Sequence, residues 1–99
     1  MADPTRTADP IAGLAEVFLA LSSPTRLRVL ARLRQGPSPV TALAEELGIG
    51  QASLSNQLRI LRHARLVAGD RDGRTVSYRL YDDHVKDFFD QALLHLRHT

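Results

Sequence analysis

Cysteine is missing from the 99 residues of this sequence. Its absence excludes disulfides, thiolate metal sites and a cysteine nucleophile, and with them the sensing of arsenite, Cd²⁺ or Cu⁺ through thiols. No apolar run approaches the roughly 20 residues of a membrane span, and the N-terminal MADPTRTADP lacks the apolar segment of a signal peptide. We therefore expect a cytoplasmic protein that has no membrane partner.

Motifs for catalysis are also missing. The sequence has no glycine-rich phosphate loop and no nucleophile–base pair at a recognisable spacing. Asp82 and His84 could form half of a hydrolytic metal site, but nothing in the sequence implies a substrate pocket beside them. We therefore expect that the protein is not an enzyme.

The charged residues are unevenly distributed, although the net charge is only +2. Residues 51–81 carry six arginines against two aspartates, a net charge of +4. Residues 1–50 have a net charge of zero, and residues 82–99 have a net charge of −2. A basic middle segment predicts one face that binds a polyanion. A solvated arginine-rich face would have the same composition, so charge alone leaves both interpretations open.

Three segments begin with a capping side chain followed by proline, the usual start of a helix. They are Asp9-Pro10, Ser23-Pro24 and Ser38-Pro39, and glycines stand near two of the expected ends, at Gly36 and Gly48. Apolar residues follow each start at helical spacing and are expected to face the core. These residues are Leu14, Val17, Phe18, Leu21, Leu27, Val29, Leu30, Leu33, Val40, Leu43, Ala44 and Leu47.

In the second half of the sequence the spacing of the apolar residues changes from helical to alternating. A fourth helix is expected over residues 51–66, with Leu54, Leu58 and Leu61 on its apolar face. The segment LVAGDRDGRTVSYRLY then alternates around Asp72-Gly73, which is a strong signal for a β-hairpin.

A last helix is expected from about Asp82 to the end of the chain, with apolar residues at helical spacing. The predicted fold is therefore mainly α with a β-hairpin wing, in the order α-α-α-α-β-β-α. We expect one winged helix-turn-helix domain over residues 8–99, with a C-terminal dimerisation helix, after a flexible tail over residues 1–7.

Two short helices joined by Gly48-Ile49-Gly50 have the arrangement of a helix-turn-helix motif. The second helix of such a motif lies in the major groove and presents its N-terminal residues to base edges. Here those residues are short, polar and uninterrupted by acid, although they could also be ordinary solvent-facing residues. The residues predicted to contact DNA, including two arginines on the wing, are Gln51, Ser53, Ser55, Asn56, Gln57, Arg59, Arg62, Arg71 and Arg74.

The segments LSSPTRLRVL, SLSNQLRILRHARLV and GRTVSYRL, in this order, resemble the ArsR–SmtB family of metal-sensing winged-helix repressors. The resemblance covers about residues 11–98. It implies a homodimer that binds an inverted-repeat operator in double-stranded DNA and releases it on binding metal. The arsenic-sensing members carry a cysteine pair on the third helix, where this sequence has Pro39 and Thr41.

The last predicted helix carries candidate metal ligands at both ends. Asp82 and His84 stand at its start, and His95 and His98 near its end; carboxylate and imidazole groups bind Zn²⁺, Co²⁺ and Ni²⁺. His84 and His95 share a helix face but lie about 16 Å apart along the axis, so they cannot hold one ion within one chain. Antiparallel pairing with a second copy would unite the two ends and form two four-ligand sites.

The spacing D-x-H-x10-H-x2-H is also what the resemblance to sensors with a C-terminal-helix metal site implies. The segment GDRDGRTVSYRLYDDHV is similar to the nickel- and cobalt-sensing branch, which slightly favours Ni²⁺. A set of four nitrogen and oxygen ligands would also suit tetrahedral Zn²⁺ or Co²⁺, so these metals stay open. Members of that branch carry further histidines beyond the position of Thr99. Other roles remain open, since Asp82 could be only a helix cap and histidines are favoured near a helix C-terminus.

These observations predict a metal-responsive transcriptional regulator, most simply a homodimeric repressor. Its affinity for DNA would change when a divalent transition metal binds at the dimer interface. One alternative is a winged-helix regulator without a metal response, whose last helix only dimerises. Another is a protein-interaction module that uses the same winged-helix surface for a protein partner.

Overall fold

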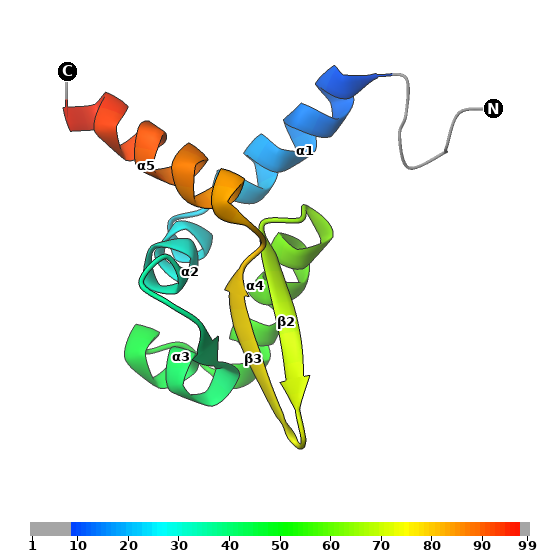
Figure 1. The fold of residues 1–99 in the computed structure, drawn as a ribbon, viewed down its shortest axis with the longest axis vertical. Helices are drawn as coiled ribbons and strands as arrows, with labels where there is room; N and C mark the ends of the chain where they lie inside the picture. Colours follow the sequence, from blue (N-terminus) through cyan, green and yellow to red (C-terminus); the bar gives the residue numbers. More distant parts are fainter. Residues whose placement is uncertain (1–8, 98–99) are drawn as a thin grey trace.

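The computed structural model describes residues 9–97 (Figure 1). The expected tail over residues 1–7 and the candidate ligand His98 lie outside the described residues. No helix in the described part of the chain is long and apolar enough to cross a membrane. The elements are α1 (Pro10–Leu21), α2 (Pro24–Leu33), β1 (Ser38–Pro39), α3 (Val40–Leu47), α4 (Gln51–His63), β2 (Val67–Asp72), β3 (Thr75–Leu80) and α5 (Asp83–Arg97).

Side-chain caps start the first two helices, as predicted. Asp9 accepts hydrogen bonds from the backbone N–H groups of Ile11 and Ala12, at 3.0 and 3.2 Å. Ser23 accepts one from the N–H of Arg26, at 3.3 Å. In both helices a proline follows the cap, where its missing N–H leaves no helical hydrogen bond unmade.

A helix follows Ser38-Pro39 as predicted, but the prediction that Ser38 caps it and Pro39 is its first residue was wrong. These residues form the short strand β1, in which Ser38 pairs with Tyr78 and Pro39 with Ser77 of β3. Ser38 is only 1% exposed, and α3 begins after it without a side-chain cap. Pairing with a strand much later in the chain overrides the local cap signal, and it adds a third strand to the sheet, in the order β1-β3-β2.

The hairpin of β2 and β3 forms the predicted wing, with its turn one residue later than expected. Asp72 pairs with Thr75, so the two-residue loop is Gly73-Arg74. Gly73 has φ +63°, which a residue with a side chain rarely adopts, so glycine suits the first position of this loop.

The core lies between α2, α3, α4 and the base of the wing. All three predicted leucines of α4 are buried, together with Val29, Leu30 and Leu33 of α2 and Leu43 of α3. These contacts hold the two helices of the helix-turn-helix motif in a fixed position relative to the wing.

The apolar stripes of α1 and α5 are mostly outside this core, contrary to the prediction. Leu14 and Phe18 of α1 are 45% and 53% exposed, and Phe89 is the buried residue of α5. Figure 1 shows the reason: α1 and α5 lie together at one end of the molecule and diverge, away from α3 and the wing tip. One chain therefore leaves an apolar surface open on both helices.

Candidate DNA interface and metal half-site

A tight turn positions the second helix of the helix-turn-helix motif. Gly48 has φ +66° and ends α3, and the N–H of Ile49 donates to the carbonyl of Ala44 at 3.0 Å. A left-handed residue at this point is the common way to end a helix, and glycine adopts it without strain. The helix α4 begins three residues after Gly48, at Gln51, and its residues Leu54 and Leu58 are fully buried.

Most of the residues predicted to contact DNA lie on the exposed side of α4. Within this group the guanidinium of Arg59 donates to the side-chain oxygen of Asn56 at 2.5 Å. This contact holds an amide and a cation together on the surface, a pairing suited to base edges and nearby phosphates. The exposed residues of the predicted set are Gln51, Ser53, Ser55, Asn56, Arg59 and Arg62.

Gln57 differs from these residues, because it faces into the protein. It is half-buried, and its Oε1 accepts a hydrogen bond of 3.0 Å from the guanidinium of Arg26. Gln57 lies three residues after Leu54 and four before Leu61, so helical spacing places it beside the buried face. That spacing could have set Gln57 apart from the exposed residues before the structure was known.

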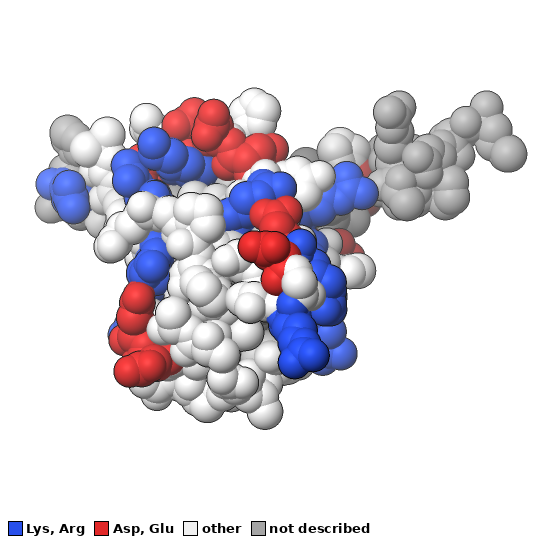
Figure 2. Space-filling view, turned by 60° about the horizontal axis from the view of Figure 1, so that its bottom comes forward, with Lys and Arg blue, Asp and Glu red and all other residues white. Residues whose placement is uncertain are grey.

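The wing supplies the other cations of the candidate interface. Arg71 and Arg74 are exposed, and their side chains make no hydrogen bond to another described residue. Arg79 differs, since it donates to Asp70 across the hairpin at 2.9 Å and to the Tyr81 carbonyl. In Figure 2 basic side chains gather on the side of the hairpin, with acidic ones beside them, and another acidic group lies on the side of α3.

Asp82 and His84 come together where α5 begins. The Oδ1 of Asp82 accepts from the N–H of Val85 at 3.1 Å, and its Oδ2 lies 3.5 Å from Nδ1 of His84. Partial burial raises the pKa of Asp82, but the hydrogen bond from Val85 and the neighbouring imidazole outweigh it, so the net shift is downward. Asp82 therefore caps the helix and also faces His84 as a carboxylate.

These two residues make only half of a metal site. Among residues 9–97, no three histidine, aspartate or glutamate side chains are close enough to share an ion. His95 is exposed near the other end of the continuous helix α5, and His98 lies outside the described residues. The donor types fit a divalent transition metal, but the described part of one chain does not complete the site.

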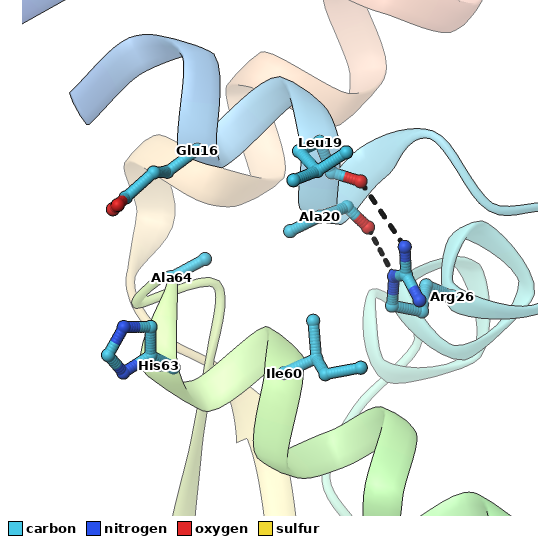
Figure 3. Close-up of a pocket in the computed structure, with 7 residues that line it drawn as sticks. All are labelled: Glu16, Leu19, Ala20, Arg26, Ile60, His63 and Ala64. Atoms are coloured by element: carbon cyan, nitrogen blue, oxygen red, sulfur yellow. Dashed lines mark hydrogen bonds between the residues drawn. The ribbon is translucent and has the colours of Figure 1, made fainter. Parts of the chain in front are cut away.

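A cavity of about 330 Å³ lies between α1, α2 and α4 (Figure 3). Apolar side chains cover most of its wall, and Arg26 lies at one end of it. In the sequence Arg26 stands out only as part of the segment LSSPTRLRVL, so its contacts were not anticipated. The lining residues are Glu16, Leu19, Ala20, Arg26, Ile60, His63 and Ala64.

Comparison with known proteins gives close relatives. A family described as "Helix-turn-helix domain" matches residues 21–70. The chain is 49% identical over 87 residues to the HTH-type transcriptional regulator NmtR of Mycobacterium tuberculosis, covering 88% of this chain and 72% of that protein. It is 40% identical over 86 residues to a transcriptional repressor SmtB homolog of Synechocystis, covering 87% of this chain and 65% of that protein.

Solved structures show the same fold. The solution structure of apo-NmtR superposes with a TM-score of 0.77 at 44% identity, over 100% of this chain and 85% of that one. The homodimeric winged helix-turn-helix DNA-binding domain of Mb0332 from Mycobacterium bovis, a possible ArsR-family regulator, gives a TM-score of 0.88 at 28% identity. That match covers 98% of this chain and 90% of the other.

These relatives confirm the winged helix-turn-helix fold predicted from the sequence. They are transcriptional regulators rather than enzymes, so the expectation of a regulator without enzymatic activity is also confirmed. The chain therefore belongs to the ArsR–SmtB family of winged-helix transcriptional regulators.

Proposed function

We propose that the protein is a homodimeric repressor that binds an inverted-repeat DNA operator and changes its DNA affinity when a divalent transition metal binds at the dimer interface. It would act in the cytoplasm, where bacterial DNA lies. One observation carries the proposal: the exposed apolar faces and the Asp82–His84 pair lie at the end of the molecule opposite the wing tip. Dimerisation and DNA binding can therefore use different surfaces.

The proposed dimer would cover the apolar side chains that α1 and α5 leave exposed. A run of large apolar residues at one end of a small protein is a common sign of a protein interface. A relative of the same fold is a homodimer, which favours a second copy of this chain as the occupant. The exposed residues on the two helices are Ile11, Leu14, Phe18, Leu19, Phe88, Leu93, Leu94 and Leu96.

The proposed DNA contacts come from α4 and the wing. The polar side of α4 would read base edges in the major groove, with Asn56 and Arg59 at its centre. Arg71 and Arg74 would contact phosphates beside it, because they carry charge that no described side chain neutralises. Two copies related by two-fold symmetry would match the two halves of an inverted repeat.

The proposed metal site joins two subunits. Asp82 and His84 of one subunit would supply two donors, and His95 and His98 of the partner subunit the other two. A bound ion would connect the start of α5 in one subunit to the end of α5 in the other. Oxygen and nitrogen donors suit Ni²⁺, Zn²⁺ and Co²⁺, and we propose Ni²⁺ as the favoured ion on the resemblance of the segment around the wing.

Mixed dimers test whether the donors meet between subunits. One variant carries Asp82→Ala and His84→Ala, and the other His95→Ala and His98→Ala. Each variant alone should bind no Ni²⁺, because both of its sites are incomplete. A heterodimer of the two keeps one complete site and should bind half as much Ni²⁺ as the wild type. A heterodimer that binds none would refute a shared site, and His63→Ala is the control histidine substitution.

DNA binding with and without metal tests the regulatory part. The probe is a labelled fragment from upstream of the protein's own gene, titrated by fluorescence anisotropy with Ni²⁺, Zn²⁺ or Co²⁺. We expect weaker binding with metal, and the largest effect with Ni²⁺. Tight, salt-dependent binding that ignores all three metals would leave a regulator without metal response. A protein that associates with another protein independently of salt and binds no DNA would be an interaction module.

A further inference from the structure

We propose that Arg26 is a positioning residue that connects α1 to the DNA-reading helix α4 through Gln57. This inference rests on the proposed DNA contacts of α4, but it concerns a side chain that does not itself face DNA. It assigns a role to Gln57 that differs from the base contact predicted from the sequence.

Three hydrogen bonds of Arg26 carry the proposal. Its Nε donates to the carbonyl of Ala20 at 2.6 Å, and one terminal nitrogen donates to the carbonyl of Leu19 at 3.2 Å. The other terminal nitrogen donates to Oε1 of Gln57 at 3.0 Å. The guanidinium is planar and presents its donors in fixed directions, so one side chain can hold two helices in a defined relation.

The position of Arg26 makes these bonds more important than three isolated surface contacts. Figure 3 shows α1 and α4 on opposite sides of the cavity, with Arg26 at one end and its two dashed bonds reaching the end of α1. Apolar packing is interrupted where the cavity separates the helices. The carbonyl groups at the end of α1 also carry partial negative charge, which favours a cation at this point.

The consequence concerns the angle of α4. Gln57 and Asn56 are on the same turn of α4. A change in the position of Gln57 would therefore also move the exposed amide of Asn56. Leu19 and Ala20 are on the last turn of α1, and Phe18 of the proposed dimer surface directly precedes them. A shift of α1 on dimerisation would therefore reach α4 through Arg26.

A double-mutant cycle tests this link. The variants are Arg26→Gln, Gln57→Met and the double variant, with Arg26→Lys as the conservative change. Affinity for the promoter fragment is measured without metal at a temperature where all variants are folded, as checked by circular dichroism. We expect each single change to weaken binding about tenfold and the double change to weaken it no further, because residues that act together are not additive. Arg26→Lys should fall between wild type and Arg26→Gln, since one ammonium cannot reach all three acceptors.

The control is Arg28→Gln, which removes the same charge from an exposed position on the same helix. An equal loss in Arg28→Gln would overturn the proposal, because the effect would then come from charge. Additive losses, or a lower melting temperature with unchanged affinity, would also overturn it and leave Arg26 a purely structural residue. Asn56→Ala and Arg59→Ala test the proposed DNA face separately. If neither change weakens binding, both the proposed DNA face and the proposed role of Arg26 are refuted.

Discussion

The guanidinium of Arg34 binds both carboxylate oxygens of Asp90, with Nε–Oδ1 at 2.5 Å and a terminal nitrogen to Oδ2 at 2.8 Å. This two-point contact joins the end of α2 to the middle of α5. Asp90 directly follows Phe89, the buried residue of α5, so the ion pair adds a polar contact to α2 beside the apolar one.

The pH dependence of folding should report on this attachment. The hydrogen bond from Arg34 is the main cause that lowers the pKa of Asp90 below its ordinary value of 3.8, and it outweighs partial burial. A carboxyl group with a lowered pKa stabilises the folded state above its unfolded pKa, and this contribution is lost as the pH falls through the folded pKa.

We therefore expect Asp90→Asn to be less stable than wild type at neutral pH, with a difference that shrinks as the pH falls below about 4. Urea unfolding at a series of pH values measures that difference. Asp87→Asn, an exposed change on the same helix, should show a smaller effect at every pH. A difference for Asp90→Asn that does not change with pH would mean that the ion pair contributes nothing.

The wing arginines should affect DNA binding without affecting sequence preference. Arg71→Ala and Arg74→Ala each remove an exposed cation from the hairpin tip. Each should weaken binding to all DNA sequences alike, because phosphate contacts carry no base information. Each should also lower the number of counterions released on binding, measured from the salt dependence of the affinity, by about one. Arg79→Ala is the matched control, since Arg79 is already paired with Asp70. Equal losses from all three arginines would contradict this assignment.

The apolar surface of α1 should be needed for dimerisation but not for the fold of one chain. Phe18 is 53% exposed, and its ring lies 6.1 Å from that of Phe88. Phe18→Glu should keep the helical circular dichroism and give a monomer by light scattering, because a charge at a buried interface is costly. Thr41→Glu, an exposed change on α3 and outside the proposed dimer surface, should remain dimeric. A dimeric Phe18→Glu would place the interface elsewhere.

Local signals in the sequence predicted much of this fold. Asp9-Pro10, Ser23-Pro24 and the buried leucines of α4 follow rules that act within one or two turns of helix. The same rules failed at Ser38-Pro39, because its strand pairing to Tyr78 depends on a residue far along the chain.

The candidate sites were predictable to a similar extent. Asp82 and His84 are neighbours in the sequence and also in space, so their pairing followed from the sequence. Gln57 contacts Arg26, which is 31 positions away in the sequence, and no local pattern predicts that contact. The exposure of Phe18 could not be foreseen either, because an apolar stripe looks the same whether it faces its own core or another subunit.

The turn after α4 contains a residue whose backbone does not suit its side chain. Arg65 has φ +59°, and the N–H of Leu66 donates to the carbonyl of Leu61 at 2.9 Å to close the end of the helix. The left-handed conformation costs a residue with a Cβ atom about 1–2 kcal/mol, whereas glycine adopts it freely. Arg65→Gly should therefore raise the free energy of unfolding by up to about 1 kcal/mol, after the greater freedom of glycine in the unfolded chain is subtracted.

Arg65→Ala separates this backbone effect from the loss of a cation near other arginines. Alanine removes the charge and the long side chain but keeps the Cβ atom, so it should not share the gain of glycine. Urea unfolding of the two variants and the wild type measures the comparison. If alanine stabilises the protein as much as glycine does, charge repulsion and not backbone strain is the cause. If the Arg65→Gly variant is less stable than the Arg65→Ala variant, the backbone conformation of Arg65 carries no strain that glycine can relieve.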